Sequence, residues 1–249
     1  MQQSELKIAL LIDADNAPAS KIDAILAEIA KYGVANIRRA YGNWKSPTLK
    51  GWENCLHEYA IYPVQQFDYT KGKNATDAAL IIDAMDLLYT QKLDAFAIVS
   101  SDCDFTPLVM RILSNGLKVY GFGEKKTPLP FVYACSIFLY LETIDRTIDS
   151  ETSKVTASDK KTGKELKQDS KLMSLLRGAV SSTQDDDGWS SLSEVGAHIA
   201  NQASFDSRNY GYAKLSGLFE VIDSFEVNRK NKAVYVRSKH KNKSNQKTA

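Results

Sequence analysis

The sequence predicts an α/β protein, in which a parallel sheet carries helices on both faces and a small α+β domain follows it. Three observations support this class. Short apolar runs alternate with helix-period segments from Leu6 to Leu141, which is the pattern of a parallel sheet. A polar stretch rich in Ser, Thr, Lys and Asp then interrupts the pattern, and a second apolar pattern follows. The expected parts are a first domain (1–145), a linker (146–168), a second domain (169–238) and a basic tail (239–249).

Each element of the first domain follows from its apolar spacing and from the Gly and Pro residues at its ends. The run Leu6–Ile12 has the composition of a strand buried on both faces. Pro18 suits the first turn of the helix that follows, and Gly33 ends that helix. In the same way we expect strands near 35–41, 61–67, 95–99, 118–122 and 137–141, and helices near 50–59, 74–89, 105–113 and 130–134.

The second domain has the layout of a winged helix, a variant of the helix-turn-helix class. A leucine-rich stripe predicts its first helix near 172–180, and Ser191-Leu-Ser-Glu194 is a capping-box pattern that opens the second. A third helix is expected over 210–219. The segments 225–227 and 233–236 are expected to pair as a hairpin with a basic tip.

Composition excludes several classes of protein. No apolar run approaches the roughly 20 residues that a membrane helix needs, and the first residues do not resemble a signal peptide. Cys55, Cys103 and Cys135 are scattered, so they predict neither a disulfide framework nor a zinc site. We therefore expect a cytoplasmic protein without a membrane partner.

The charges are distributed unevenly along the 249 residues. Residues 1–150 carry 15 Lys and Arg against 18 Asp and Glu, whereas the remainder carries 17 against 12. After Glu226 there is no acidic residue, and eight basic ones follow. A basic arm beside an acidic domain indicates a polyanionic partner, with nucleic acid the first candidate. The alternative is a solvated tail that serves only solubility.

Acidic residues from separate segments are expected at one edge of the first sheet. Asp13 follows the first strand, and Asp102 and Asp104 follow the buried strand 95–99, so all three lie at carboxyl ends of parallel strands, where open α/β sheets bind ligands. Asp77 lies in a first helical turn and shares its face with apolar residues. The alternative is capping: Asp77 could serve its helix N-terminus, and one of the other two, with Asp104 favoured, could cap the next helix. Asp83 and Asp86 are expected to face solvent.

Clustered carboxylates of this kind suit a hard cation, Mg²⁺ or Mn²⁺. Such an ion can clamp a phosphodiester, activate an attacking water and stabilise the leaving oxygen. His57, His198 and His240 share no motif, so a histidine mechanism is not favoured.

The first domain resembles the NYN-domain family of PIN-like ribonucleases. The resemblance spans about residues 6–143 and rests on three ordered motifs: Asp13-x-x-Asn16, Lys73-Asn-Ala-Thr-Asp77, and Ser101-Asp-Cys-Asp-Phe105 with Pro107-Leu108. It implies a Rossmann-like sheet and metal-dependent RNA cleavage by Asp13, Asp77, Asp102 and Asp104, with Asn16 and Ser101 in support. Asp13-Ala-Asp15 also resembles the nucleophile motif of haloacid-dehalogenase-like phosphatases, but Asn16-Ala17 follows it in place of the usual Gly-Thr.

The second domain resembles the OST-HTH (LOTUS) domain over about 169–238. The resemblance rests on spaced motifs: Asp187-Gly-Trp189, Leu192-x-x-Val195-Gly196, Phe205-Asp206-x-Arg208-x-Tyr210-Gly211-Tyr212 and Lys214-Leu-x-x-Leu218-Phe219. It implies RNA binding or, in some relatives, the docking of a protein. The candidates for RNA contact are Arg208, Tyr210 or Tyr212, Lys214, Arg229, Lys230 and Lys232. The alternative places Tyr212 in the core and leaves the basic residues merely exposed.

Together these features predict a metal-dependent ribonuclease whose winged helix recruits RNA. The alternative is a non-catalytic RNA-binding adaptor that retains the nuclease fold. Cleavage that requires a divalent ion distinguishes the first from the second.

Overall fold

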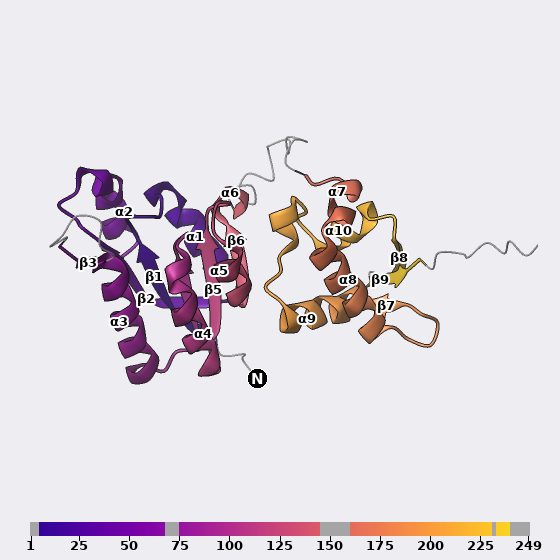
Figure 1. Ribbon diagram of the computed structural model, residues 1–249. Coiled ribbons are helices and arrows are strands. Elements are labelled where there is room, and N and C mark those ends of the chain that lie inside the picture. The colour runs from indigo at the N-terminus through magenta and orange to yellow at the C-terminus, as the bar shows by residue number, and fades with distance from the viewer. Residues whose placement is uncertain (1–4, 68–74, 145–159, 231–232, 240–249) are drawn as a thin grey trace, which may run out of the picture. The chain divides into compact units, whose positions relative to one another are not determined.

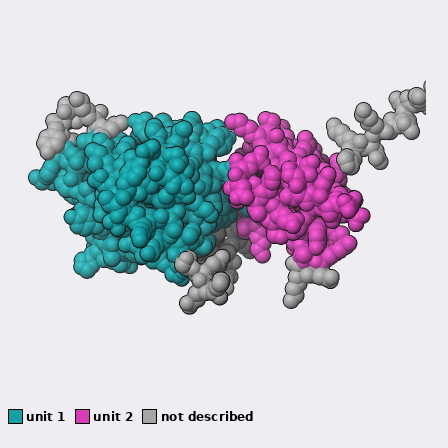
Figure 2. All heavy atoms as spheres, turned by 90° about the horizontal axis from the view of Figure 1, so that it is seen from below, with its two compact units in different colours: residues 1–155, 203–209 teal, residues 156–202, 210–249 magenta. Residues whose placement is uncertain are grey.

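The computed structural model describes residues 5–67, 75–144, 160–230 and 233–239. The chain divides into two compact units, which Figure 2 colours separately: residues 1–155 with 203–209, and residues 156–202 with 210–249. Each unit is described by itself below.

The first unit is built on a six-stranded sheet in the order β3-β2-β1-β4-β5-β6. Every neighbouring pair in it is parallel, as the alternation of strands and helices predicts. The strands are β1 (Leu6–Asp13), β2 (Gly33–Gly42), β3 (Tyr62–Gln65), β4 (Ala95–Val99), β5 (Lys118–Gly123) and β6 (Ile137–Tyr140).

Helices cover both faces of this sheet, which Figure 1 shows as coiled ribbons beside the arrows. One apolar core joins the sheet to α1 (Ile22–Ile29), to the turn and helix before β3, including α2 (Glu53–Glu58), and to α6 (Leu141–Ile144). The other core joins it to α3 (Ala75–Thr90), α4 (Thr106–Ser114) and α5 (Leu129–Ala134). None of the helices in the described ranges is both long and apolar enough to cross a membrane.

The second unit is smaller and combines helices with an antiparallel sheet in the order β7-β9-β8. Its elements are α7 (Gly163–Gln168), α8 (Ser170–Thr183), β7 (Ser190–Ser191), α9 (Leu192–Gln202), α10 (Leu215–Val221), β8 (Phe225–Lys230) and β9 (Ala233–Ser238). The predicted hairpin is confirmed, since β8 and β9 pair from Phe225↔Ser238 to Lys230↔Ala233.

Two predictions for this region are wrong in detail. Helix α7 occupies 163–168, which the polar composition assigned to a linker. It forms because Thr162 and Glu165 make a complete capping box, which stabilises a short helix despite its few apolar residues. The expected helix over 210–219 begins only at Leu215, because Gly211 adopts a positive φ of 87° that no α-helix accommodates.

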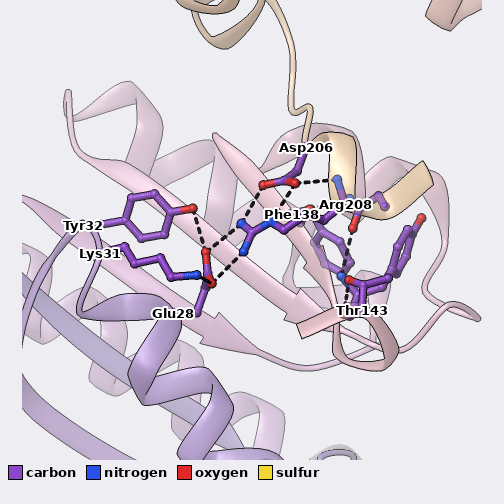
Figure 3. A network of polar contacts seen from close by, with 9 residues as sticks. Glu28, Lys31, Tyr32, Phe138, Thr143, Asp206 and Arg208 are labelled. Atoms are coloured by element: carbon purple, nitrogen blue, oxygen red, sulfur yellow. Dashed lines mark hydrogen bonds and ion pairs between the residues drawn. The ribbon is translucent and has the colours of Figure 1, made fainter. Parts of the chain in front are cut away.

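The segment 203–209 belongs to the first unit, although its sequence lies inside the predicted second domain. Figure 3 shows the guanidinium of Arg208 between the carboxylates of Glu28 and Asp206. It donates to both carboxylate oxygens of Glu28, each at 2.7 Å. Asn209 adds two bonds to β6, donating to the Phe138 carbonyl at 2.7 Å and accepting from the Tyr140 N–H at 3.3 Å.

We refer to this bidentate ion pair between Glu28 and Arg208 as the Glu28–Arg208 clasp. It is buried, with 2% of the Glu28 side chain and 14% of the Arg208 side chain exposed. Burial opposes ionisation of Glu28, but hydrogen bonds from Arg208 and Lys31 outweigh it and lower the pKa of Glu28. Lys31 and Tyr32 on the first unit complete the set of donors to this carboxylate. The segment 203–209 therefore supplies the bidentate partner of a buried acid in the first unit.

Candidate active site

The candidate site lies at the carboxyl end of β1 and β4, which are neighbours at the centre of the sheet. From β1 the chain proceeds outward through β2 and β3, and from β4 it proceeds through β5 and β6 on the other side. The strand order thus reverses between β1 and β4, and open α/β sheets bind ligands at such a point. Asp13 ends β1, and Ser100 follows β4 directly.

Asp13 is fully buried at this point, with 0% of its surface exposed. Its Oδ2 atom accepts hydrogen bonds from Asn16 Nδ2 at 2.9 Å and from Ser100 Oγ at 2.8 Å. Its Oδ1 atom has no hydrogen-bond partner among the described residues. Burial raises the pKa of Asp13 despite these two hydrogen bonds. A buried carboxylate oxygen without a partner is costly, and a cation would satisfy it.

Asp77 lies in the first turn of α3, on the buried face that its helical position predicts. Burial raises its pKa to about 6, and repulsion from Asp13, Asp102, Asp104 and Asp15 adds to the effect. The repulsion involves acids at the ends of β1 and β4 and at the start of α3. A divalent cation would relieve it.

The loop after β4 holds Asp102, Cys103 and Asp104 close together. Their ligand atoms lie within 4.8 Å of one another, which makes them a possible metal-binding group among the described residues. Asp102 accepts from the Asp104 N–H at 2.9 Å and so caps the short 3₁₀ helix Cys103–Phe105. The expectation that Asp104 would be the cap is therefore wrong, because Asp102 occupies the extended position before this turn.

Ser100, and not the expected supporting residue Ser101, contacts Asp13. Ser100 donates to Asp13 and accepts from the Asp102 N–H at 3.1 Å, so it joins the two acids. Ser101 instead accepts from the Glu124 N–H at 2.9 Å. The alternation of side chains along a strand could have shown this, because consecutive residues point to opposite faces.

Two further acids have partners that the sequence does not predict. Asp15 accepts from Thr76 Oγ1 at 3.0 Å, which links the loop after β1 to the start of α3. Asp83 does not simply face solvent, because Arg39 and Tyr41 on β2 both donate to its carboxylate. A helical wheel could not reveal this, since β2 lies beside α3 only in the folded chain.

The expected RNA contacts divide into two groups. Arg208 is engaged in the clasp with Glu28 and Asp206, and Lys232 lies outside the described residues. Lys214 and Lys230 are exposed on the second unit, the former as the residue before α10. Arg229 is exposed too and forms an ion pair with Glu220.

The two tyrosines considered for base stacking have different environments. Tyr212 is 4% exposed, and its hydroxyl donates to the Lys161 carbonyl at 2.6 Å, so the alternative that placed it in the core is confirmed. Tyr210 is half-buried, and the Lys161 ammonium lies 5.0 Å from its ring centroid. Of the two tyrosines, Tyr210 is the less buried.

Comparison with known families agrees with this architecture. The NYN domain model matches residues 7–142, more than half of the chain. The chain belongs to the NYN-domain family. The OST-HTH/LOTUS domain model matches residues 166–237. NYN domains are nuclease-type hydrolases, so the pair of domains supports a ribonuclease or an RNA-binding role for the chain.

Individual relatives add little about activity. An uncharacterized protein of Methanocaldococcus jannaschii is 27% identical over 128 residues, and the chain spans about half the length of that relative. A crystal structure of a protein of unknown function from Vibrio parahaemolyticus is similar at 20% identity, with a TM-score of 0.46. That similarity covers 56% of this chain and 96% of the other.

Proposed function

We propose that this NYN protein is a metal-dependent ribonuclease and that its OST-HTH domain binds the RNA. The observation that carries the proposal is the buried Oδ1 atom of Asp13, which lacks a hydrogen-bond partner within the described residues. Asp13 also repels the carboxylate of Asp77, as Asp102 and Asp104 do. Among the described residues, the ligand atoms of Asp102, Cys103 and Asp104 lie within 4.8 Å of one another, and Asp13 and Asp77 lie outside that group. Keeping several carboxylates together in a protein interior is unfavourable unless a cation compensates them.

The oxygen-rich donor set suits Mg²⁺ or Mn²⁺, which Asp13, Asp77, Asp102 and Asp104 would hold. When bound, such an ion polarises a phosphodiester and favours in-line attack by water. Asn16 and Ser100 both donate to Oδ2 of Asp13, and these bonds fix the carboxylate, whose buried Oδ1 atom has no hydrogen-bond partner among the described residues. Ser100 also accepts from the backbone N–H of Asp102, so it positions two of the acids at once.

The second domain would compensate for the repulsion between RNA and the acidic cluster. Lys214 and Lys230 are exposed and can contact phosphates, and the chain carries only basic charges after Glu226. Tyr210, which is half-buried, can stack on a base. Arg208 is a weaker candidate for RNA contact, because its guanidinium already donates hydrogen bonds to the carboxylates of Glu28 and Asp206.

The test is cleavage of labelled RNA in Mg²⁺ or Mn²⁺, with EDTA as the metal-free condition. We expect wild-type protein to cut and Asp13→Asn and Asp102→Asn to lose nearly all cleavage. Asp86→Asn is the matched control, because Asp86 is an exposed acid on the same helix as Asp77. If either cluster variant cuts as fast as wild type, the acids do not carry the reaction.

The alternative function is an RNA-binding adaptor that retains the fold without the reaction, and the basic C-terminal sequence supports it. It predicts RNA binding that EDTA leaves unchanged, no cleavage with any divalent ion, and no heat of metal binding in calorimetry. Calorimetric Mn²⁺ binding that Asp13→Asn abolishes would exclude it.

A further inference from the structure

A cavity of about 350 Å³ lies beside the acidic cluster in the first unit. It is formed by the loop after β1, the turn that precedes α2 and the segment after β5, and these three segments are distant in sequence. Its volume falls at the lower end of the range for small-ligand sites and suits one nucleoside.

The cavity shares a wall with the candidate active site. Asp15 and Asn16 line it, and Asn16 also donates to the buried carboxylate of Asp13. Asp15 accepts a hydrogen bond from Thr76 of α3, the residue that precedes Asp77. A group in this cavity would therefore lie next to a phosphate bound at the acids.

The lining of the cavity is mainly polar and suits a neutral group with several N–H donors. Its apolar part includes the buried residues Ala17, Leu49 and Trp52. Its polar part includes the carboxylates of Asp15 and Glu124, and the one cation, Lys126, forms an ion pair with Glu124. An isolated phosphate would meet this excess of negative charge, whereas an amino group of a base would find acceptors.

We infer that this cavity is a nucleobase subsite, which holds the RNA base next to the scissile phosphate and favours bases with an exocyclic amino group. Adenine, cytosine and guanine present such donors, and uracil does not. The inference rests on the proposed RNA cleavage for its role, but the cavity's preference for a base can be measured without cleavage.

A larger side chain at Gly51 can fill the cavity while every acidic residue is left unchanged. A Cβ atom added to Gly51 would lie 3.9 Å from the Cβ of Ala19, at ordinary contact distance, and both residues line the cavity. Gly51→Leu should therefore fold and occupy space that a base needs. Gly178→Leu is the matched control, since a Cβ on Gly178, in α8 of the other unit, has no atom within 4 Å.

The experiment measures binding of adenosine, cytidine, guanosine and uridine to the full chain in EDTA by saturation-transfer NMR. We expect the three amino-bearing nucleosides to bind wild type more tightly than uridine. Gly51→Leu should weaken them about tenfold, and Gly178→Leu should leave them unchanged. Circular dichroism and thermal unfolding verify that both variants are folded.

A second measurement maps the bases beside the cuts in a random RNA. Wild type should cut next to amino-bearing bases, and Gly51→Leu should lose this preference. No nucleoside binding to wild type, or unchanged binding and cut sites in folded Gly51→Leu, overturns the inference even where cleavage occurs. Nucleoside binding that Gly51→Leu removes, in a chain that cuts no RNA, instead supports the subsite and overturns the proposed ribonuclease.

Discussion

Replacing Asp77 with asparagine tests whether the acids are held together at a cost. The pKa of Asp77 rises from 3.8 to about 6, chiefly through burial and then through repulsion by the other acids. At about 1.4 kcal/mol for each unit, the ionised form lowers the free energy of unfolding by at most about 3 kcal/mol. Because the pKa of Asp77 is raised in the folded state, the protein is free of this loss below pH 3.8, where the carboxyl is protonated in both states. The loss grows as the pH rises and is complete above about pH 6.

Metal-free Asp77→Asn should therefore be more stable than wild type at pH 7.5, by up to about 3 kcal/mol, and the difference should shrink toward pH 4. The assay is urea unfolding in EDTA, followed by hydrogen exchange in peptides from β1 and β4, which reports on the first unit separately. Mn²⁺ should stabilise wild type and should stabilise the variant less.

Asp83→Asn is the control for this experiment, because it makes the same change on the same helix. Asp83 accepts from Arg39 and Tyr41, so the control should be less stable than wild type at pH 7.5. If Asp77→Asn were also destabilising in EDTA, or if its effect did not vary with pH, the conclusion that burial and the neighbouring acids disfavour the ionised form of Asp77 would be refuted.

Three further substitutions probe other parts of the chain. Arg208→Met leaves Glu28 buried without its bidentate partner and should cost the first unit about 3–5 kcal/mol in urea unfolding, whereas a loss under about 1 kcal/mol would contradict the clasp. Ser100→Ala should weaken Mn²⁺ binding roughly 10–100-fold in calorimetry, and Ser101→Ala should not. Equal effects of the two substitutions would contradict the role of Ser100 in positioning the Asp13 carboxylate. Lys230→Ala should reduce RNA affinity and lower the salt slope by about 1 in filter binding, and an unchanged slope would exclude a phosphate contact.

The architecture of both units could be predicted from local sequence patterns. Apolar runs alternating with helix-period segments specify a parallel sheet, because only such a sheet buries strands on both faces. Errors arose where local backbone chemistry outweighed apolar spacing. Gly211 delays the helix that the spacing placed over 210–219, and the Thr162–Glu165 capping box builds α7 in a stretch with little apolar character.

The candidate site was only partly accessible to sequence reasoning. The order of β1 and β4 in the sheet follows from general rules of parallel topology, and it places Asp13 and Asp102 at one edge. The choice of Ser100 over Ser101 depends on which face of the strand end each side chain occupies. The capping role of Asp102 depends on the backbone angles of one turn.

The fold class and the family follow from the amino-acid sequence, because both depend on residue types at regular or characteristic spacings. The folded structure determines which side-chain atoms have hydrogen-bond partners. It leaves Oδ1 of Asp13 without a partner in the described chain, and it commits Arg208 to Glu28, 180 positions away. The physical reason is that burial and pairing arise between segments that only the folded chain brings together, and no local pattern encodes them.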